Sequence, residues 1–65
     1  MSPHKQAEKD LDKAGYIIKR NDNGHVIYYH PELKCIIPLK RHDFNDNDLK
    51  YIRKEIKQNE RKRGN

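Results

Sequence analysis

The chain has 65 residues, which is enough for one domain but too few to enclose a deep cavity, because a chain of this length buries only about 60% of the surface that it exposes when unfolded. With 15 Lys and Arg against 10 Asp and Glu, its net charge of +5 favours a polyanionic partner, either nucleic acid or an acidic protein. The single cysteine, Cys35, excludes an internal disulfide. No apolar run is long enough for a signal peptide or a membrane span. We therefore expect a cytoplasmic protein with no membrane partner.

The first predicted element is a helix over residues 2–14. Ser2 can cap its N-terminus, Pro3 suits the first helical position, and Gly15 can end it in a left-handed conformation. The apolar side chains recur at spacings of four and three residues, on one face of the helix: Ala7, Leu11 and Ala14. We expect this narrow stripe to pack on a sheet.

Short runs typical of strands follow the first helix, namely "YIIKR" at 16–20, "HVIYYH" at 25–30 and "LKCIIPL" at 33–39. The first run leads into the turn signal "NDNG" at 21–24, and Pro31 breaks the second run. Pro38 lies in the third run, so it should occupy a strand end or an edge strand. The short connections predict an antiparallel meander.

A second helix is predicted after "HDFNDND". Asn45 is a good N-cap, and Asp46 and Asp48 suit the positive end of a helix. An apolar stripe follows at helical spacing: Leu49, Ile52 and Ile56. Residues 59–65 are dominated by charge, and we expect them to form a frayed basic tail of a single domain spanning residues 1–65.

The resulting order of helix, three strands and helix is that of double-stranded-RNA-binding domains. In that α+β fold two helices pack on one face of a three-stranded antiparallel sheet. Because a fold does not define a function, the order alone does not assign an activity.

The sequence contains no Gly-rich phosphate loop and no Cys/His spacing suited to zinc, so we expect no metal and no other cofactor. Histidines and phosphate-binding cations remain. They suffice for the cleavage of RNA by its own 2′-hydroxyl, because the substrate supplies the nucleophile while the protein moves protons and offsets charge.

The run "NGHVIYYHP" at 23–31 resembles the HicA family, the toxins of bacterial HicA–HicB toxin–antitoxin pairs. The family has Gly-Ser-His, two variable residues, an aromatic residue and, shortly afterwards, His-Pro. In this chain His25 matches the family's first histidine, Tyr28 its aromatic residue and His30-Pro31 its His-Pro. The coarse resemblance extends from "DKAGYIIKR" to the apolar stripe of the second helix.

The resemblance implies an endoribonuclease toxin that cleaves messenger RNA, without a metal, through the single catalytic histidine His25. It also implies a HicB-like antitoxin that binds the toxin and occludes the His25 face. The chain departs from the family at Asn23-Gly24, which replaces Gly-Ser and therefore lacks the serine hydroxyl. Asn23 and Gly24 both tolerate the positive φ of a tight turn, so we expect the turn itself to be kept.

Side chains alternate along residues 25–30, so His25 and Tyr29 share one face of the strand while Val26 and Tyr28 share the other. Tyr28 takes the aromatic position of the HicA pattern. We therefore expect Val26 and Tyr28 to face the core, and His25 and Tyr29 to lie on the more open face.

Cations near the histidine are candidates for phosphate contacts. Lys19 and Arg20 precede the turn that presents His25, and Lys40 and Arg41 precede the second helix. One histidine does not readily serve as both base and acid in one turnover, so water, Tyr29 or Lys19 could supply the second proton transfer. The second helix also has a basic outer side that could bind RNA with strong salt dependence: Lys50, Arg53, Lys54, Lys57, Arg61, Lys62 and Arg63.

Two alternatives to a ribonuclease remain open from the sequence. One is an RNA-binding module of the same fold that does not cleave, and its RNA affinity would not depend on His25. The other is a protein-binding accessory relative, whose basic surface meets an acidic partner and which has little affinity for RNA.

Overall fold

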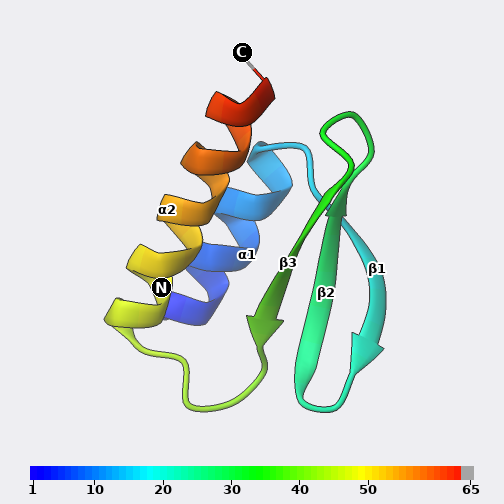
Figure 1. Ribbon diagram of the computed structural model, residues 1–65. Helices are drawn as coiled ribbons and strands as arrows, with labels where there is room; N and C mark the ends of the chain where they lie inside the picture. The colour runs from blue at the N-terminus through cyan, green and yellow to red at the C-terminus, as the bar shows by residue number, and fades with distance from the viewer. Residues whose placement is uncertain (64–65) are drawn as a thin grey trace.

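The chain folds as an α+β domain in the predicted order. The structure, a computed structural model, describes residues 1–63 and gives these bounds: α1 (Pro3–Lys13), β1 (Ile17–Asp22), β2 (His25–His30), β3 (Cys35–Lys40) and α2 (Asp46–Arg63). Within these residues the strands form one antiparallel sheet in the order β1-β2-β3. Figure 1 shows α1 and α2 side by side on one side of this sheet, running in the same direction. The predicted fold class, with two helices on one face of a three-stranded antiparallel sheet, is confirmed.

The first helix begins and ends where its capping residues predict. The Ser2 hydroxyl accepts the Lys5 backbone N–H at 3.3 Å, and Pro3 is the first helical residue. At the other end Gly15 has φ +95°, and the Tyr16 N–H donates to the Leu11 carbonyl at 3.0 Å. This reversal is a Schellman motif, which satisfies carbonyls that the helix end would otherwise leave unpaired.

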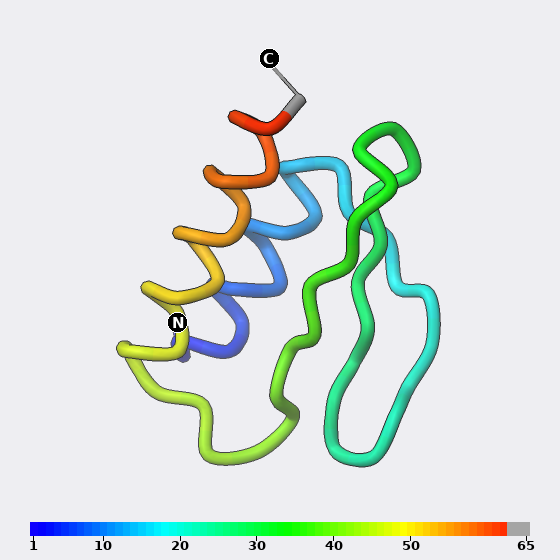
Figure 2. The backbone as a smooth tube through the Cα atoms, in the orientation of Figure 1, coloured from blue at the N-terminus to red at the C-terminus, as the bar shows by residue number. Residues whose placement is uncertain are grey.

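The turn between β1 and β2 is tighter than the four-residue signal suggested. Asn23 and Gly24 have φ +25° and +80°, which is the pattern of a two-residue type I′ turn. Because that turn needs only two residues, Asn21 and Asp22 belong to β1 and pair with β2. Figure 2 shows this turn and the loop 41–45 at the same end of the molecule, opposite the C-terminal end of α2.

A β-bulge lies in β1 at Lys19, where the pairing with β2 shifts by one residue. The regular alternation of β2 is therefore undisturbed. Tyr28 is buried in the core and Val26 packs against it, while His25 is exposed on the other face, as the strand pattern predicted.

The core lies between the helices and the inner face of the sheet, and its buried side chains come from every element but β1: Ala7, Leu11, Tyr16, Tyr28, Ile37, Leu39, Leu49, Ile52 and Ile56. Each fully buried Leu or Ile contributes about 1.5–3 kcal/mol to stability. The helices cover β2 and β3 but leave β1 outside, so Ile18, which pairs with the buried Tyr28, is 60% exposed. Pro38 lies in β3, an edge strand, as expected.

The second helix starts at the predicted cap but extends further than expected. The Asn45 side-chain oxygen accepts the backbone N–H groups of Asn47 and Asp48 at 2.9 and 3.1 Å, and the Asp48 carboxylate accepts the Asn45 N–H at 3.0 Å. Residues 59–63, expected as the start of a frayed tail, continue α2, because Asn59 donates to the Tyr16 hydroxyl at 3.0 Å and so ties the last turns to the core. Residues 64–65 of that tail lie outside the described residues. Across residues 1–63 neither helix combines the length and the apolar character needed to cross a membrane.

Candidate active site

The face of the sheet turned away from α1 and α2, called the open face below, presents its side chains in rows across the strands. Residues that pair directly in an antiparallel sheet share a face. The register therefore defines these rows, from the middle of the molecule to the β1–β2 turn: Ile17–Tyr29–Ile36, Arg20–Ile27–Pro38 and Asp22–His25–Lys40. The rows change from apolar to charged toward the turn.

His25 is the first residue of β2 and is exposed on the open face. Its Nδ1 lies 3.4 Å from the Asn23 carbonyl oxygen, a long contact that holds the ring loosely. A shallow pocket surrounds it, lined also by Asp22, Asn23, Ile27 and Pro38. Because the carbonyl can only accept, Nδ1 is the donor in this contact, and in the neutral form of the ring Nε2 then carries the free lone pair.

His30, the other histidine of the HicA-like pattern, is part of the fold and not of the site. It is 8% exposed, its Nδ1 accepts the Leu33 N–H at 3.1 Å, and its Nε2 donates to the Ala14 carbonyl at 3.0 Å. Both ring nitrogens are thus used to join the end of α1 to the β2–β3 connection. His4 is also engaged, by Glu8 at 3.2 Å and by an edge-to-face contact with Phe44. Among residues 1–63 the exposed histidines are therefore His25 and His42.

The predicted phosphate-binding cations are distributed unequally around His25. Arg20 is exposed and lies across from Ile27, one row from His25. Arg41 is exposed next to the turn, because its backbone N–H donates to the Gly24 carbonyl at 2.9 Å. Lys40 pairs with His25 in the register, but its Nζ is turned toward the start of α2, where it contacts the Asp43 carbonyl at 3.3 Å and the Asp48 carboxylate at 3.7 Å.

Tyr29 and Lys19, the two side chains considered for the second proton transfer, lie together but far from His25. The Lys19 Nζ is 5.1 Å from the centroid of the Tyr29 ring. Tyr29 is four residues along β2 from His25, which corresponds to about 13 Å in a strand. The structure instead places Asp22 directly across from His25. Asp22 was not among the predicted site residues, because the turn signal "NDNG" includes it.

Tyr28 and Gly24 support the site without lining the pocket around His25, whereas Asn23 also lines it. Tyr28 is buried on the inner face, and burial raises the pKa of its hydroxyl above the usual value, with the negative charges of Glu8 and Asp12 adding to the effect. Asn23 and Gly24 supply the positive φ values of the turn. A Cβ at Gly24 would meet no atom within 4 Å, so this position is restricted by its backbone conformation and not by space.

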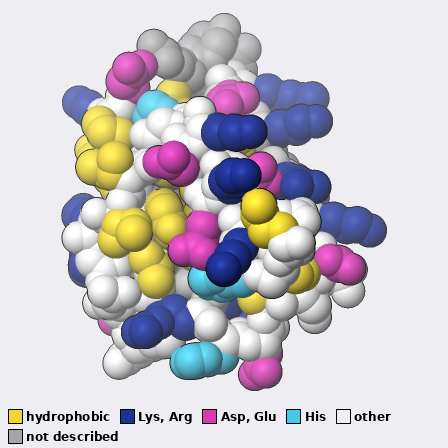
Figure 3. Space-filling view, turned by 180° about the vertical axis from the view of Figure 1, so that it is seen from behind, with side chains coloured by type: hydrophobic (Ala, Val, Ile, Leu, Met, Phe, Trp, Pro, Cys, Tyr) yellow, Lys and Arg dark blue, Asp and Glu magenta, His cyan; other side chains and the backbone are white. Residues whose placement is uncertain are grey.

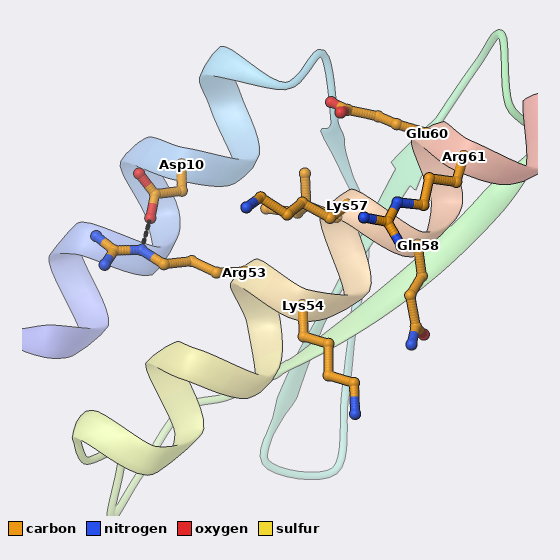
Figure 4. A pocket seen from close by; sticks show the side chains of 8 residues that line it. Asp10, Arg53, Lys54, Lys57, Gln58, Glu60 and Arg61 are labelled. Carbon is orange, nitrogen blue, oxygen red and sulfur yellow. Dashed lines mark hydrogen bonds and ion pairs between the residues drawn. The ribbon is translucent and has the colours of Figure 1, made fainter. Parts of the chain in front are cut away.

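Four basic residues of α2 line a groove on the helix layer, away from the open face, namely Arg53, Lys54, Lys57 and Arg61, while Lys62 lies by the β2–β3 connection. Arg53 is bound to Asp10 of α1 at 2.7 Å, and Figure 4 shows it beside Lys57, Lys54 and Arg61 along a shallow groove on α2. The side chain of Arg63 lies outside the described set. Figure 3, seen from behind, shows hydrophobic side chains gathered toward the sheet and Lys and Arg more often toward the helices. The cations of α2 and His25 therefore do not form one continuous site.

Comparison with known proteins gives no match for this chain to a protein-family model, to a curated protein or to a solved structure.

Proposed function

We propose that this protein is a HicA-like toxin, an endoribonuclease that cleaves messenger RNA without a metal and uses His25 for proton transfer. The observation that carries the proposal is the contrast between the two histidines of the HicA-like pattern. His30 is buried with both ring nitrogens engaged, whereas His25 is exposed at the turn end of the β1–β2 hairpin with Nε2 available. The resemblance assigns the catalytic role to His25, and its environment suits that role.

The chemistry requires little of the protein. Nε2 of His25 accepts the proton of an RNA 2′-hydroxyl, the 2′-oxygen attacks the adjacent phosphorus, and the bond to the 5′-oxygen breaks. The products are a 2′,3′-cyclic phosphate and a 5′-hydroxyl whose proton comes from water. In this proposal the charge that develops on the phosphate oxygens is offset by Arg20, one row from His25, and by Arg41, beside the turn.

A HicB-like antitoxin is the protein partner that this proposal implies. The open face offers it an apolar surface about 13 Å along β2 from His25, because Ile17 and Ile36 are about half exposed on either side of Tyr29. A partner bound there would occlude His25 and block access of RNA.

The decisive experiment is induced expression of the wild type and of His25→Ala in a bacterial host, with growth and messenger RNA integrity followed together. We expect the wild type to arrest growth and fragment RNA, and His25→Ala to do neither while keeping a wild-type circular dichroism spectrum, because His25 is exposed and its loss costs little stability. His42→Ala, which removes the other exposed histidine, is the matched control and should remain toxic. Equal toxicity of wild type and His25→Ala would contradict the proposal.

One observation favours a second candidate, an RNA-binding module that does not cleave. Asn23-Gly24 stands where the HicA pattern has Gly-Ser, so no hydroxyl lies beside His25. Such a protein would bind RNA in a salt-sensitive manner, leave it intact and be unaffected by His25→Ala. If it instead had little affinity for RNA at physiological salt, the protein-binding accessory role would be the better description.

A further inference from the structure

Two features of the open face have no part in the proton transfer at His25. The first is the pocket floor beside His25, formed by Ile27, which is only 6% exposed, and by Pro38 across from it. The second is Tyr29, one row further along β2, whose ring is half-buried with the Lys19 ammonium over it. His25, Ile27 and Tyr29 follow one another on the same face at intervals of about 6.6 Å. This interval is close to the spacing of nucleotides in an extended single strand.

We propose that single-stranded RNA lies along the open face of the sheet, with a phosphate at His25, one base on the Ile27–Pro38 floor and the next base stacked on Tyr29. Base stacking on a sheet-borne aromatic ring is a common mode of single-strand recognition. The contact of Lys19 with the Tyr29 ring is an exposed and weak one. A base therefore takes the ring face while the ammonium moves to the neighbouring phosphate.

The position of the cations argues for this path across the sheet. A strand lying on the basic side of α2 would be on the far side of the helix layer and could not present a phosphate to His25. On the open face β1 contributes the exposed cations Lys19, over the Tyr29 ring, and Arg20, in the Ile27 row. Arg41 lies by the β1–β2 turn. Among the row residues Asp22 is the one carboxylate, so the charge of this face suits a polyanion.

The shape of the site argues for a single strand and against a duplex. In an A-form duplex the bases are stacked inside the helix, so neither Tyr29 nor the Ile27–Pro38 floor would have a base face to contact. Although this chain has the fold of double-stranded-RNA-binding domains, we therefore do not expect double-stranded RNA to be its preferred ligand. The part of the inference at His25 rests on the proposed function, whereas the stacking positions can be tested by binding alone.

The test measures binding of a short fluorescent RNA with 2′-O-methyl sugars, which cannot be cleaved through the 2′-hydroxyl, to the full-length protein. We expect Tyr29→Leu to weaken binding about 5- to 150-fold, the range for loss of one stacked base. Lys19→Gln should lower the slope of log affinity against log salt by about 0.7, the value for one phosphate contact on a single strand. A hairpin duplex of the same composition should bind more weakly than the single strand.

The helix layer supplies matched controls. Tyr51 is an exposed tyrosine of α2 and Lys57 an exposed lysine of α2, so Tyr51→Leu and Lys57→Gln remove the same groups from the opposite side. We expect both to bind the single strand like the wild type, and thermal unfolding should show that all four variants are folded. Stronger effects from the α2 variants, or preferred binding of the duplex, would overturn the proposal.

The outcomes separate this inference from the proposed function. If the wild type cleaves RNA through His25 but Tyr29→Leu binds normally, the path over the sheet is wrong while the ribonuclease assignment stands, and the apolar rows are left to a protein partner. If Tyr29→Leu loses binding but the wild type never cleaves, the path is supported and the protein is a binding module.

Discussion

His25 and His30 show how environment gives one residue type two roles. They are five residues apart on β2 and point to opposite faces of the sheet. His30 lies under the end of α1, where Ala14 and Leu33 supply an acceptor and a donor for its ring. His25 lies past the reach of the helices and keeps a free nitrogen. Reactivity at this site therefore depends on which face of β2 the helices cover.

The two glycines with positive φ give a prediction at this scale. Gly24→Ala should cost about 1 kcal/mol, because only the backbone conformation opposes a side chain there. Gly15→Ala should cost at least about 1 kcal/mol more, because its Cβ would lie 3.0 Å from the His30 Nε2 and push that ring from its hydrogen bond with Ala14. Urea denaturation of both variants measures these losses. Equal losses in the free energy of unfolding would show that the His30 contact does not contribute to stability.

At the scale of elements, α2 depends on a local cap whose signal is fully contained in the sequence. Asn45 accepts two backbone N–H groups of the first turn, and Asp48 accepts the N–H of Asn45. α2 carries the apolar stripe that closes the core. Its first turn also ends the loop 41–45, in which Arg41 is bound to the β1–β2 turn.

Replacing the cap should therefore weaken the whole domain. We expect Asn45→Ala to lower the free energy of unfolding by about 1 kcal/mol, because two backbone donors lose their partner. Asn47→Ala is the matched control, since it removes an amide side chain two residues further on and leaves the cap in place. Thermal unfolding of both variants distinguishes them, and an Asn47→Ala variant as unstable as Asn45→Ala would contradict the capping argument.

The elements that sequence reasoning located well are those set by local chemistry. Ser2, Gly15 and Asn45 are caps that act within a few residues, and the alternation along β2 placed Val26 and Tyr28 correctly. What it missed depends on contacts between distant segments. The bulge at Lys19 follows from pairing with β2, and the turn of Lys40 toward α2 follows from Asp48.

The whole molecule is joined by a small polar cluster around Tyr16, which is 2% exposed. Its hydroxyl accepts a hydrogen bond from Asn59 of α2 at 3.0 Å and lies 3.5 Å from Cys35 Sγ of β3, while its ring contacts His30 of β2 edge to face. Tyr16 itself follows the Schellman motif of α1. The Tyr16 side chain therefore connects both helices with the sheet, at the end of the molecule far from the β1–β2 turn. Ionisation of its hydroxyl should affect the stability of the entire domain.

This cluster predicts a loss of stability in alkali. Burial, together with the contact to Cys35, raises the pKa of Tyr16 to about 12, whereas an unfolded tyrosine titrates near pH 10. Between these values the unfolded chain releases a proton that the folded chain keeps, so ionisation favours unfolding as the pH rises. The free energy of unfolding should be unaffected by this group below about pH 10 and fall by about 2–3 kcal/mol by about pH 12. A domain this small has only about 3–5 kcal/mol in total, so most of its stability would be lost.

Urea denaturation across this range of pH should show a clearly smaller fall in the free energy of unfolding for Tyr16→Phe than for the wild type. The fall that remains comes from Tyr28, whose pKa is also raised. Tyr51→Phe, which changes an exposed tyrosine, should follow the wild type. If Tyr16→Phe loses as much stability in alkali as the wild type, the buried hydroxyl is not the group that links the fold to pH.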